Sequence, residues 1–209
     1  MNTRRLWWMV AIAVLVAAAA VPARADTIYD NGPLDGNTQA YAINFGNSVS
    51  DSFFLSQSGF FVTGATIGLW AFPGDIPRTV DWSLGTSFFA SDVASGTSSL
   101  TRKFDFTNSF GHDVYTSTLS FGTLNFSFQQ GPYYLTLQNA TTRFDNPIYW
   151  DQNNGPSQAM DSSLGPVPSE TFQILGTFEG GGPAEPASFL LLGSGLLGLV
   201  GAIRRRMKA

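Results

Sequence analysis

The chain has 209 residues, no cysteine, one histidine and a formal net charge of −4. Without cysteine it has no disulfide, thiol nucleophile or sulfur-ligated metal, and one histidine cannot supply the imidazoles of a usual zinc site. Residues 26–182 contain four Lys and Arg against fourteen Asp and Glu, a formal net charge of −10. Because nucleic acid needs a positive field to bind, we do not expect it as a partner.

The N-terminus has the pattern of a secretory signal peptide. Two arginines precede the apolar stretch 6–21, and Ala23 and Ala25 form an Ala-x-Ala cleavage site. We therefore predict that residues 1–25 are a signal peptide and that the mature, exported chain begins at Asp26. An uncleaved N-terminal membrane anchor is the alternative.

Residues 26–178 read as one domain built from strands. Phe, Tyr, Trp, Thr, Val and Ser are abundant, no stretch keeps a helical apolar period, and several stretches alternate apolar and polar residues. Gly, Pro, Asn and Asp separate these runs. The pattern predicts an all-β, antiparallel β-sandwich or jelly-roll-like domain, although sequence does not separate a sandwich from a barrel. The predicted strands are 39–45, 66–72, 79–86, 100–106, 113–121, 124–128, 132–139 and 171–178, and 153–170 is predicted to be a loop.

The body shows no pattern that requires catalysis. His112 is the sole histidine available for a Ser-His-Asp site, and the chain has no Gly-x-Ser-x-Gly elbow. A carboxylate pair for glycoside hydrolysis remains a less favoured alternative, because the spacing that matters is spatial and Asp is common. The two glutamates of the body are Glu170 and Glu179. We expect no catalytic residues and no metal ligands.

Binding is better supported than catalysis. Tyr149, Trp150, Asp151 and Asn153 join aromatic rings to carboxylate and amide groups, a combination that stacks on sugars and binds their hydroxyl groups. They are candidate ligand-binding residues, and the favoured alternative makes the rings core residues and the polar groups turn caps. We expect no cofactor. Structural calcium stays open at two oxygen-rich loops, and structural turns are the favoured interpretation. Those loops contain Asp30, Asn31 and Asp35, and Asp145, Asp151 and Asn153.

The C-terminal end has the order of a membrane tether. Residues 179–188 form a Gly/Pro linker, 189–203 an apolar run and 204–209 a basic tail. Fifteen helical residues span about 22 Å, less than the roughly 30 Å of a bilayer core. Basic residues beside a spanning segment stay cytoplasmic. We predict a short transmembrane helix over 189–203, stopped at the inner membrane by Arg204, Arg205 and Arg206.

These terminal residues resemble a known sorting domain. Glu185-Pro186-Ala187-Ser188, the Leu/Gly-rich stretch 190–199 and the arginines 204–206 are similar to the PEP-CTERM domain of Gram-negative bacteria. The resemblance implies a sorting motif at Pro183, Glu185 and Pro186, read by an exosortase-like processing enzyme. Ala184 departs from the Pro-Glu-Pro triplet. The segments 51–53, 72–75, 134–140 and 149–153 of the body also resemble the globular parts of other PEP-CTERM proteins of unassigned activity, which implies no chemistry.

Together these observations predict an exported protein that is tethered to the inner membrane during transit and then reaches the cell surface or extracellular matrix. Its expected role is a non-catalytic surface or matrix protein associated with exopolysaccharide or biofilm. A carbohydrate-binding β-sandwich module is the alternative, and a glycan hydrolase is less favoured. Extracellular polysaccharide is accordingly a candidate partner.

Overall fold

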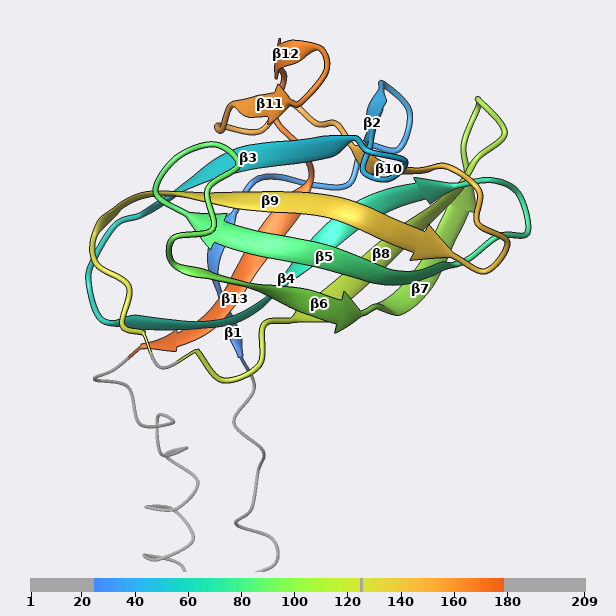
Figure 1. Cartoon of the computed structure of the whole chain (residues 1–209). Coiled ribbons are helices and arrows are strands. Elements are labelled where there is room, and N and C mark those ends of the chain that lie inside the picture. The colour runs from blue at the N-terminus through green and yellow to red at the C-terminus, as the bar shows by residue number, and fades with distance from the viewer. Residues whose placement is uncertain (1–24, 125, 179–209) are drawn as a thin grey trace, which may run out of the picture. The chain divides into compact units, whose positions relative to one another are not determined.

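A computed structural model describes residues 25–124 and 126–178, which form two antiparallel β-sheets and contain no helix (Figure 1). The predicted all-β class is confirmed, and the two packed sheets fit a β-sandwich. The strands are β1 (Asp26–Asp30), β2 (Ala40–Ala42), β3 (Ser48–Leu55), β4 (Phe60–Ala71), β5 (Pro77–Gly85), β6 (Ala94–Ser99), β7 (Thr101–Thr107), β8 (Asp113–Ser120), β9 (Gly131–Thr142), β10 (Ile148–Asp151), β11 (Ala159–Asp161), β12 (Gly165–Val167) and β13 (Phe172–Phe178).

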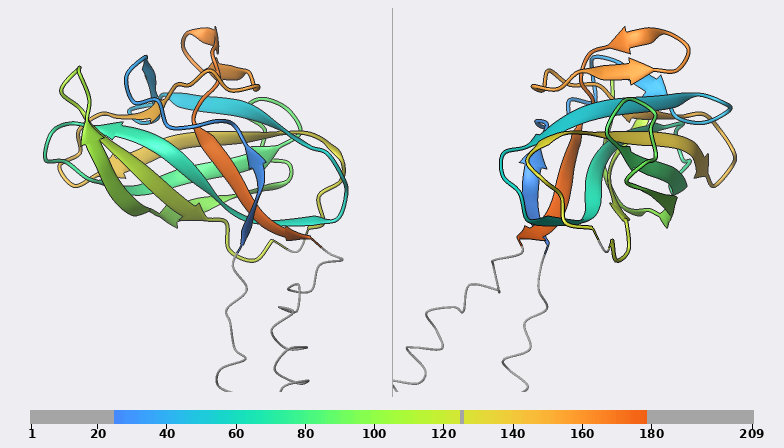
Figure 2. Two further views of the ribbon diagram at one scale, coloured as in Figure 1. Left: turned by 180° about the vertical axis from the view of Figure 1, so that it is seen from behind. Right: turned by 60° about the vertical axis from the view of Figure 1, so that its left-hand side comes forward.

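The seven-stranded sheet, here sheet A, is organised around the long strand β4. Along one edge of β4, β13 pairs with its first part and β10 with its last part, while β8 pairs along the other edge. β1 extends the sheet beyond β13, β2 beyond β10 and β7 beyond β8. Because β1 and β13 are antiparallel, with Asp26 opposite Gly176, the described chain begins and ends at the same end of the domain (Figure 2).

The six-stranded sheet, here sheet B, has the strand order β12-β11-β3-β9-β5-β6. Of its central strands β3, β9 and β5, the last two lie in segments where alternation predicted a half-buried strand. Val49, Leu135, Leu137 and Leu84 point into the core with Ile67 and Leu69 of sheet A. Successive side chains of a strand point to opposite faces, so the residues between these core positions form the outer face of sheet B.

Seven of the eight predicted strands overlap an observed one, and the differences have physical causes. The predicted strand 124–128 is wrong: its described residues hold only a single β-bridge, between Phe128 and Phe60. The stretch 153–170, predicted to be a loop, contains the short strands β11 and β12. Strand β3 was missed, because its inner face carries Asp51 among apolar residues and its outer face carries three serines.

Several predicted segments lie outside the described residues. They are the signal peptide up to residue 24 with Ala23, the linker 179–188 with Pro183, Glu185 and Pro186, the apolar run 189–203, and the tail 204–209 with Arg204, Arg205 and Arg206. Ala25 is the first residue that the structure describes. Within the described ranges, no helix has the length and apolar character needed to cross a membrane.

Candidate functional site: the outer face of sheet B

Two polar rows cross the outer face of sheet B, and strand register builds both. One row consists of Ser50, Thr136, Ser83 and Ser95, and the other of Ser48, Gln138, Asp81 and Thr97. Each row takes one residue from each of β3, β9, β5 and β6. Directly opposite residues in adjacent strands lie about 4.5–5.5 Å apart. The outer face therefore carries eight polar side chains in two lines, seven of them without charge. Ser50, Thr136 and Ser83 of the first row are buried.

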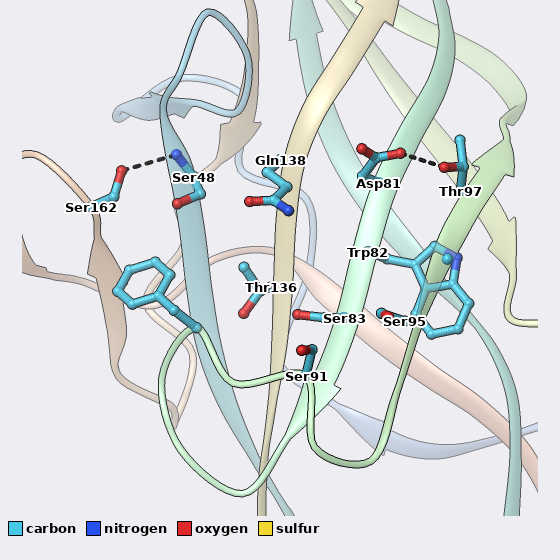
Figure 3. A pocket seen from close by; sticks show the side chains of 12 residues that line it. Ser48, Asp81, Trp82, Ser83, Ser91, Ser95, Thr97, Thr136, Gln138 and Ser162 are labelled. Atoms are coloured by element: carbon cyan, nitrogen blue, oxygen red, sulfur yellow. Dashed lines mark hydrogen bonds between the residues drawn. The ribbon is translucent and has the colours of Figure 1, made fainter.

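Seven of these eight side chains, all but that of Ser50, line a groove of about 410 Å³ (Figure 3). Gln138 and Thr136 stand in its middle, with Ser48 on one side and Ser83 and Asp81 on the other. Its volume lies within the range of about 300–1,000 Å³ that is usual for ligand sites. The side chains at the bottom of the groove are mainly those of Ser and Thr. Because they are short, they leave room for an extended ligand to lie across the strands.

Some polar groups of the groove already bond to other protein groups. The hydroxyl of Thr136 bonds to Ser50 Oγ at 2.9 Å, and Ser83 Oγ donates to Ala90 O at 3.1 Å. Asp81 accepts from Thr97 Oγ1 and, at 3.0 Å, from Asn139 Nδ2. The exposed side chain of Gln138 has no hydrogen-bond partner among the described residues. Its amide can both donate to and accept from a ligand.

One wall of the groove is the loop 86–93 between β5 and β6. Thr86 and Asp92 close the loop, since the amide and hydroxyl of Thr86 donate to the Asp92 carboxylate at 2.9 and 2.6 Å. The loop then packs on Gly85, where an added Cβ would come within 2.5 Å of Ala90 O. A larger residue at position 85 would therefore push the wall away from the sheet.

Phe89 on this loop has an unusual conformation. Its φ is 62°, in the left-handed region that bulky residues seldom adopt, and 38% of its surface is exposed. The Phe89 amide donates to Ser50 Oγ at 3.2 Å, which fixes the backbone above the first row. Such strain persists where the surroundings enforce it, and it is concentrated at functional sites. The loop thus holds an exposed aromatic ring at the groove.

Of the predicted ligand-binding residues, Tyr149 alone reaches a surface hollow. It lines a pocket of about 200 Å³ on sheet A together with Gln39, Trp70, Phe110 and His112. The Phe110 ring stacks on Trp70 with centroids 5.7 Å apart, and the His112 ring meets Tyr149 edge-on at 5.7 Å. The buried His112 Nδ1 has no partner among the described residues. This pocket is smaller and more apolar than the groove.

The other three predicted ligand residues are structural, which corrects the sugar-site hypothesis at these positions. Trp150 is fully buried and its Nε1 donates to Thr171 O at 2.9 Å, so its ring cannot stack on a surface sugar. Asp151 and Asn153 are also buried. Asn153 Nδ2 donates to Asn31 O at 2.7 Å, joining two loops. Alternation along β10 explains the separation, because Tyr149 and Trp150 point to opposite faces.

Asp151 anchors the loop before β2. Its carboxylate accepts from the amides of Asp35 and Gly36 at 3.0 and 2.8 Å and from Trp70 Nε1 at 2.6 Å. The Thr171 hydroxyl donates a fourth bond at 2.7 Å. Burial raises the pKa of Asp151, and these four bonds oppose that rise. Because four donors bond to its two oxygens, the Asp151 carboxylate has a structural role.

In the first oxygen-rich loop considered for calcium, Asp30 and Asp35 accept hydrogen bonds within turns, whereas Asn31 bonds to distant segments. Asp30 Oδ1 accepts from Gly32 N at 2.9 Å, and Asp35 accepts from the Thr38 hydroxyl. Asn31 Nδ2 donates to Ser157 Oγ and to Glu170 O, both at 2.6 Å. In the described part of the chain, no group of three or more His, Cys, Asp or Glu side chains is placed to hold a metal ion.

The fold also brings together two carboxylates that sequence spacing could not connect. Asp51 on β3 and Glu170 before β13 interact electrostatically, and both are fully buried. Burial raises the pKa of Asp51 to about 6 and the pKa of Glu170 well above its usual value. A hydrolytic pair must reach a glycosidic oxygen, and burial keeps both groups from the surface here.

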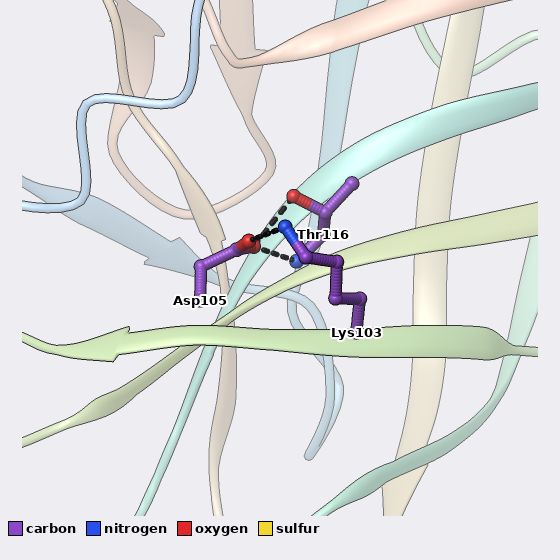
Figure 4. Close-up of polar contacts among 3 residues, drawn as sticks. All are labelled: Lys103, Asp105 and Thr116. Carbon is purple, nitrogen blue, oxygen red and sulfur yellow. Dashed lines mark hydrogen bonds and ion pairs between the residues drawn. The ribbon is translucent and has the colours of Figure 1, made fainter.

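Positive charge is sparse and lies elsewhere. The ion pair found in the described ranges joins Lys103 to Asp105 on β7, at 2.7 Å (Figure 4). Asp105 also accepts from the amide and hydroxyl of Thr116 on β8, at 2.7 and 2.6 Å. Lys103 is largely exposed, so the pair adds little stability. None of the groove residues is cationic.

No protein-family model matches the chain, and no curated protein matches it. Among solved structures, the chain is similar to SACOL2612, a CocE/NonD family hydrolase from Staphylococcus aureus, with 11% sequence identity and a TM-score of 0.31. The match covers 75% of this chain and 37% of the hydrolase, so the chain spans well under half of that protein's length. A likeness this weak carries no argument about function.

Proposed function

We propose that the protein is an exported surface or extracellular-matrix protein that binds neutral polysaccharide, without catalysis, through the groove on sheet B. The sorting signals predicted at the two ends supply the route: export, a tether at the inner membrane, processing by an exosortase-like enzyme and release to the surface. The observation that carries the binding role is the pair of polar rows across β3, β9, β5 and β6.

The chemistry of the rows fits a polyhydroxylated chain. Hydroxyl and amide groups can donate and accept, as sugar hydroxyls do, and they lose little when an uncharged ligand displaces their water. Phe89 adds an exposed ring for the C–H face of a sugar. Asp81 and the acidic body disfavour an anionic polymer, because like charges repel. The favoured ligand is therefore a neutral glycan segment that lies across the strands.

Calorimetric titration of the mature protein with neutral β-glucan oligosaccharides, and with alginate oligosaccharides as the anionic comparison, tests this proposal. We expect binding of the neutral chain alone. Gln138→Ala should weaken it about tenfold, the equivalent of one or two hydrogen bonds together worth about 1.4 kcal/mol. Phe89→Gly should also weaken it. Glycine fits the positive φ of this position, so the change removes the ring and spares the loop.

Tyr149→Ala is the matched control, because it removes a ring from the aromatic pocket on sheet A and leaves the groove intact. It should not alter binding. Loss of binding in Tyr149→Ala with normal binding in Gln138→Ala and Phe89→Gly would transfer the site to that pocket. A wild-type protein that binds no neutral glycan, or that releases reducing ends from one, would contradict the proposed function.

A further inference from the structure

Glu170 is a buried carboxyl group with no partner. Its side chain has no exposed surface, and neither Oε1 nor Oε2 has a hydrogen bond among the described residues. It forms an isolated β-bridge with Gln152, flanked by backbone bonds from Asn153 to Ser169 and from Thr171 to Asp151. In this arrangement the opposed side chains of Gln152 and Glu170 lie close together on one face. A buried polar group without a partner requires an explanation.

Its surroundings are acidic. Asp51 on β3, Asp151 on β10 and Asp161 on β11 all act on Glu170 with the same sign of charge, and all three are buried. We call Glu170 and these three aspartates the acidic set; the described residues are not grouped closely enough to hold a metal ion. Tyr41 on β2 reaches the bridge partner of Glu170, because its hydroxyl donates to Gln152 Oε1 at 3.2 Å. Burial, followed by the charge of Glu170, raises the pKa of the Tyr41 phenol. No lysine, arginine or histidine is among the groups that influence Glu170.

An ionised Glu170 would be costly in this place. A buried charge needs an opposite charge or several hydrogen bonds, and otherwise the group takes up a proton. Asp51 already has such bonds, because it accepts from the amides of Glu170 at 2.7 Å and Ser52 at 2.6 Å. Among the described residues, Glu170 has neither an opposite charge nor a hydrogen bond to stabilise an ionised carboxylate. A bound metal ion could also stabilise the charge, but the described residues contain no group of three or more His, Cys, Asp or Glu side chains that could hold one.

We propose that Glu170 is a neutral carboxylic acid in the folded protein at neutral pH, and that its bound proton keeps the chain segments around it together. We call this arrangement a proton-dependent latch. Burial, followed by the charges of Asp51, Asp151 and Asp161, raises the pKa of Glu170 and supports this state. As long as the proton is present, the acidic set carries one negative charge fewer, at a residue with no exposed surface. When the proton leaves, the fold must expose this carboxylate or accommodate it unpaired.

The latch would hold together chain segments that are distant in sequence. Asn31 Nδ2 donates to Glu170 O at 2.6 Å and to Asp51 Oδ2 at 3.3 Å, which ties the segment after β1 to β3 and to the segment before β13. Ser169 Oγ donates to Asn153 Oδ1 at 2.7 Å. Tyr29 connects β1 to the same bonds, because its hydroxyl donates to Asn31 Oδ1 at 2.8 Å. Movement of Glu170 would break its bond from Asn31 and disturb the other bonds of Asn31 and of the adjacent Ser169.

The direction of the pH effect follows from linkage. The folded state holds the Glu170 proton more tightly than the unfolded chain, whose pKa is near 4.5. The contribution of Glu170 to stability should therefore be fully present below that value and fall as pH rises, until the folded pKa is reached. Asp51 acts in the same direction between 3.8 and about 6. Above pH 6, Glu170 should increase the unfolding equilibrium constant about tenfold per pH unit until it ionises.

The direct test is an NMR titration of the mature wild-type protein, labelled with ¹³C at the glutamate carboxyl carbons. The sequence after the signal peptide has three glutamates, Glu170, Glu179 and Glu185, so the spectrum is simple. Glu170→Gln identifies the Glu170 signal by its disappearance. We expect that signal to keep the shift of a protonated acid at pH 7. A Glu170 signal with the shift of an ionised carboxylate at pH 7 would overturn the proposal.

Urea unfolding between pH 6 and 8 provides the second measurement. Glu170→Gln keeps the size of the side chain and removes its charge. The rise of about tenfold per pH unit in the unfolding equilibrium constant should therefore be lost in this variant, which should be at least as stable as the wild type at pH 8. Asp145→Asn, which removes an exposed carboxylate from a loop, is the charge-matched control and should keep the wild-type slope. If the Glu170 signal moves when millimolar calcium is added at pH 7, the carboxyl group binds a metal ion and not a proton, and the proposal is overturned.

Discussion

Replacing Asp151 with alanine should severely destabilise the domain. The substitution leaves the Asp35 and Gly36 amides, Trp70 Nε1 and the Thr171 hydroxyl without an acceptor. An unsatisfied buried donor costs about 1–3 kcal/mol, and water entering the vacated space would satisfy some of them. We therefore expect a loss of about 4 kcal/mol, a large part of the roughly 5–15 kcal/mol that stabilises a typical domain.

Smaller changes at the same site give a graded series. Thr171→Val and Trp70→Phe each remove one donor and leave the carboxylate with three, so each should cost about 1–2 kcal/mol. Asp151→Asn keeps the size but turns one end into a donor facing donors, and should fall between these and alanine. Urea unfolding at pH 7, followed by far-UV circular dichroism, measures all four. An Asp151→Ala protein that loses less than 1 kcal/mol would refute the anchoring role of this carboxylate.

The remaining predictions concern the two ends of the chain. Mass spectrometry of the exported protein should find Asp26 as the first residue, and an N-terminus at Met1 would show that no signal peptide is cleaved. Deleting residues 184–209 should release the exported protein from membranes, and a truncated protein that still sediments with membranes in high salt would place the anchor elsewhere. Changing both Glu185 and Pro186 to alanine should leave the protein membrane-bound but unprocessed. Normal processing of that variant would remove the motif from the sorting mechanism.

Hydrophobic alternation was the informative signal for the fold. In the predicted strands 79–86 and 132–139, every second residue is apolar, and the six residues concerned are all buried: Val80, Trp82, Leu84, Tyr133, Leu135 and Leu137. Where the pattern was mixed, prediction failed. Strand β3 buries Asp51 beside Val49 and Phe53, and a carboxylate on a core-facing position interrupts the alternation that identifies a strand.

The sequence by itself determined the all-β class, most strand positions, the acidic body and the absence of cysteine chemistry, because these depend on local composition and on a period of two. It also indicated which side chains of β5 and β9 face away from the core. Only the tertiary structure decided which strands are neighbours, and therefore that Ser48, Gln138, Asp81 and Thr97 form one row. In the same way, it placed Glu170 against Asp51, 119 residues away along the chain. Long-range pairing of this kind arises from packing and register, which no local pattern encodes.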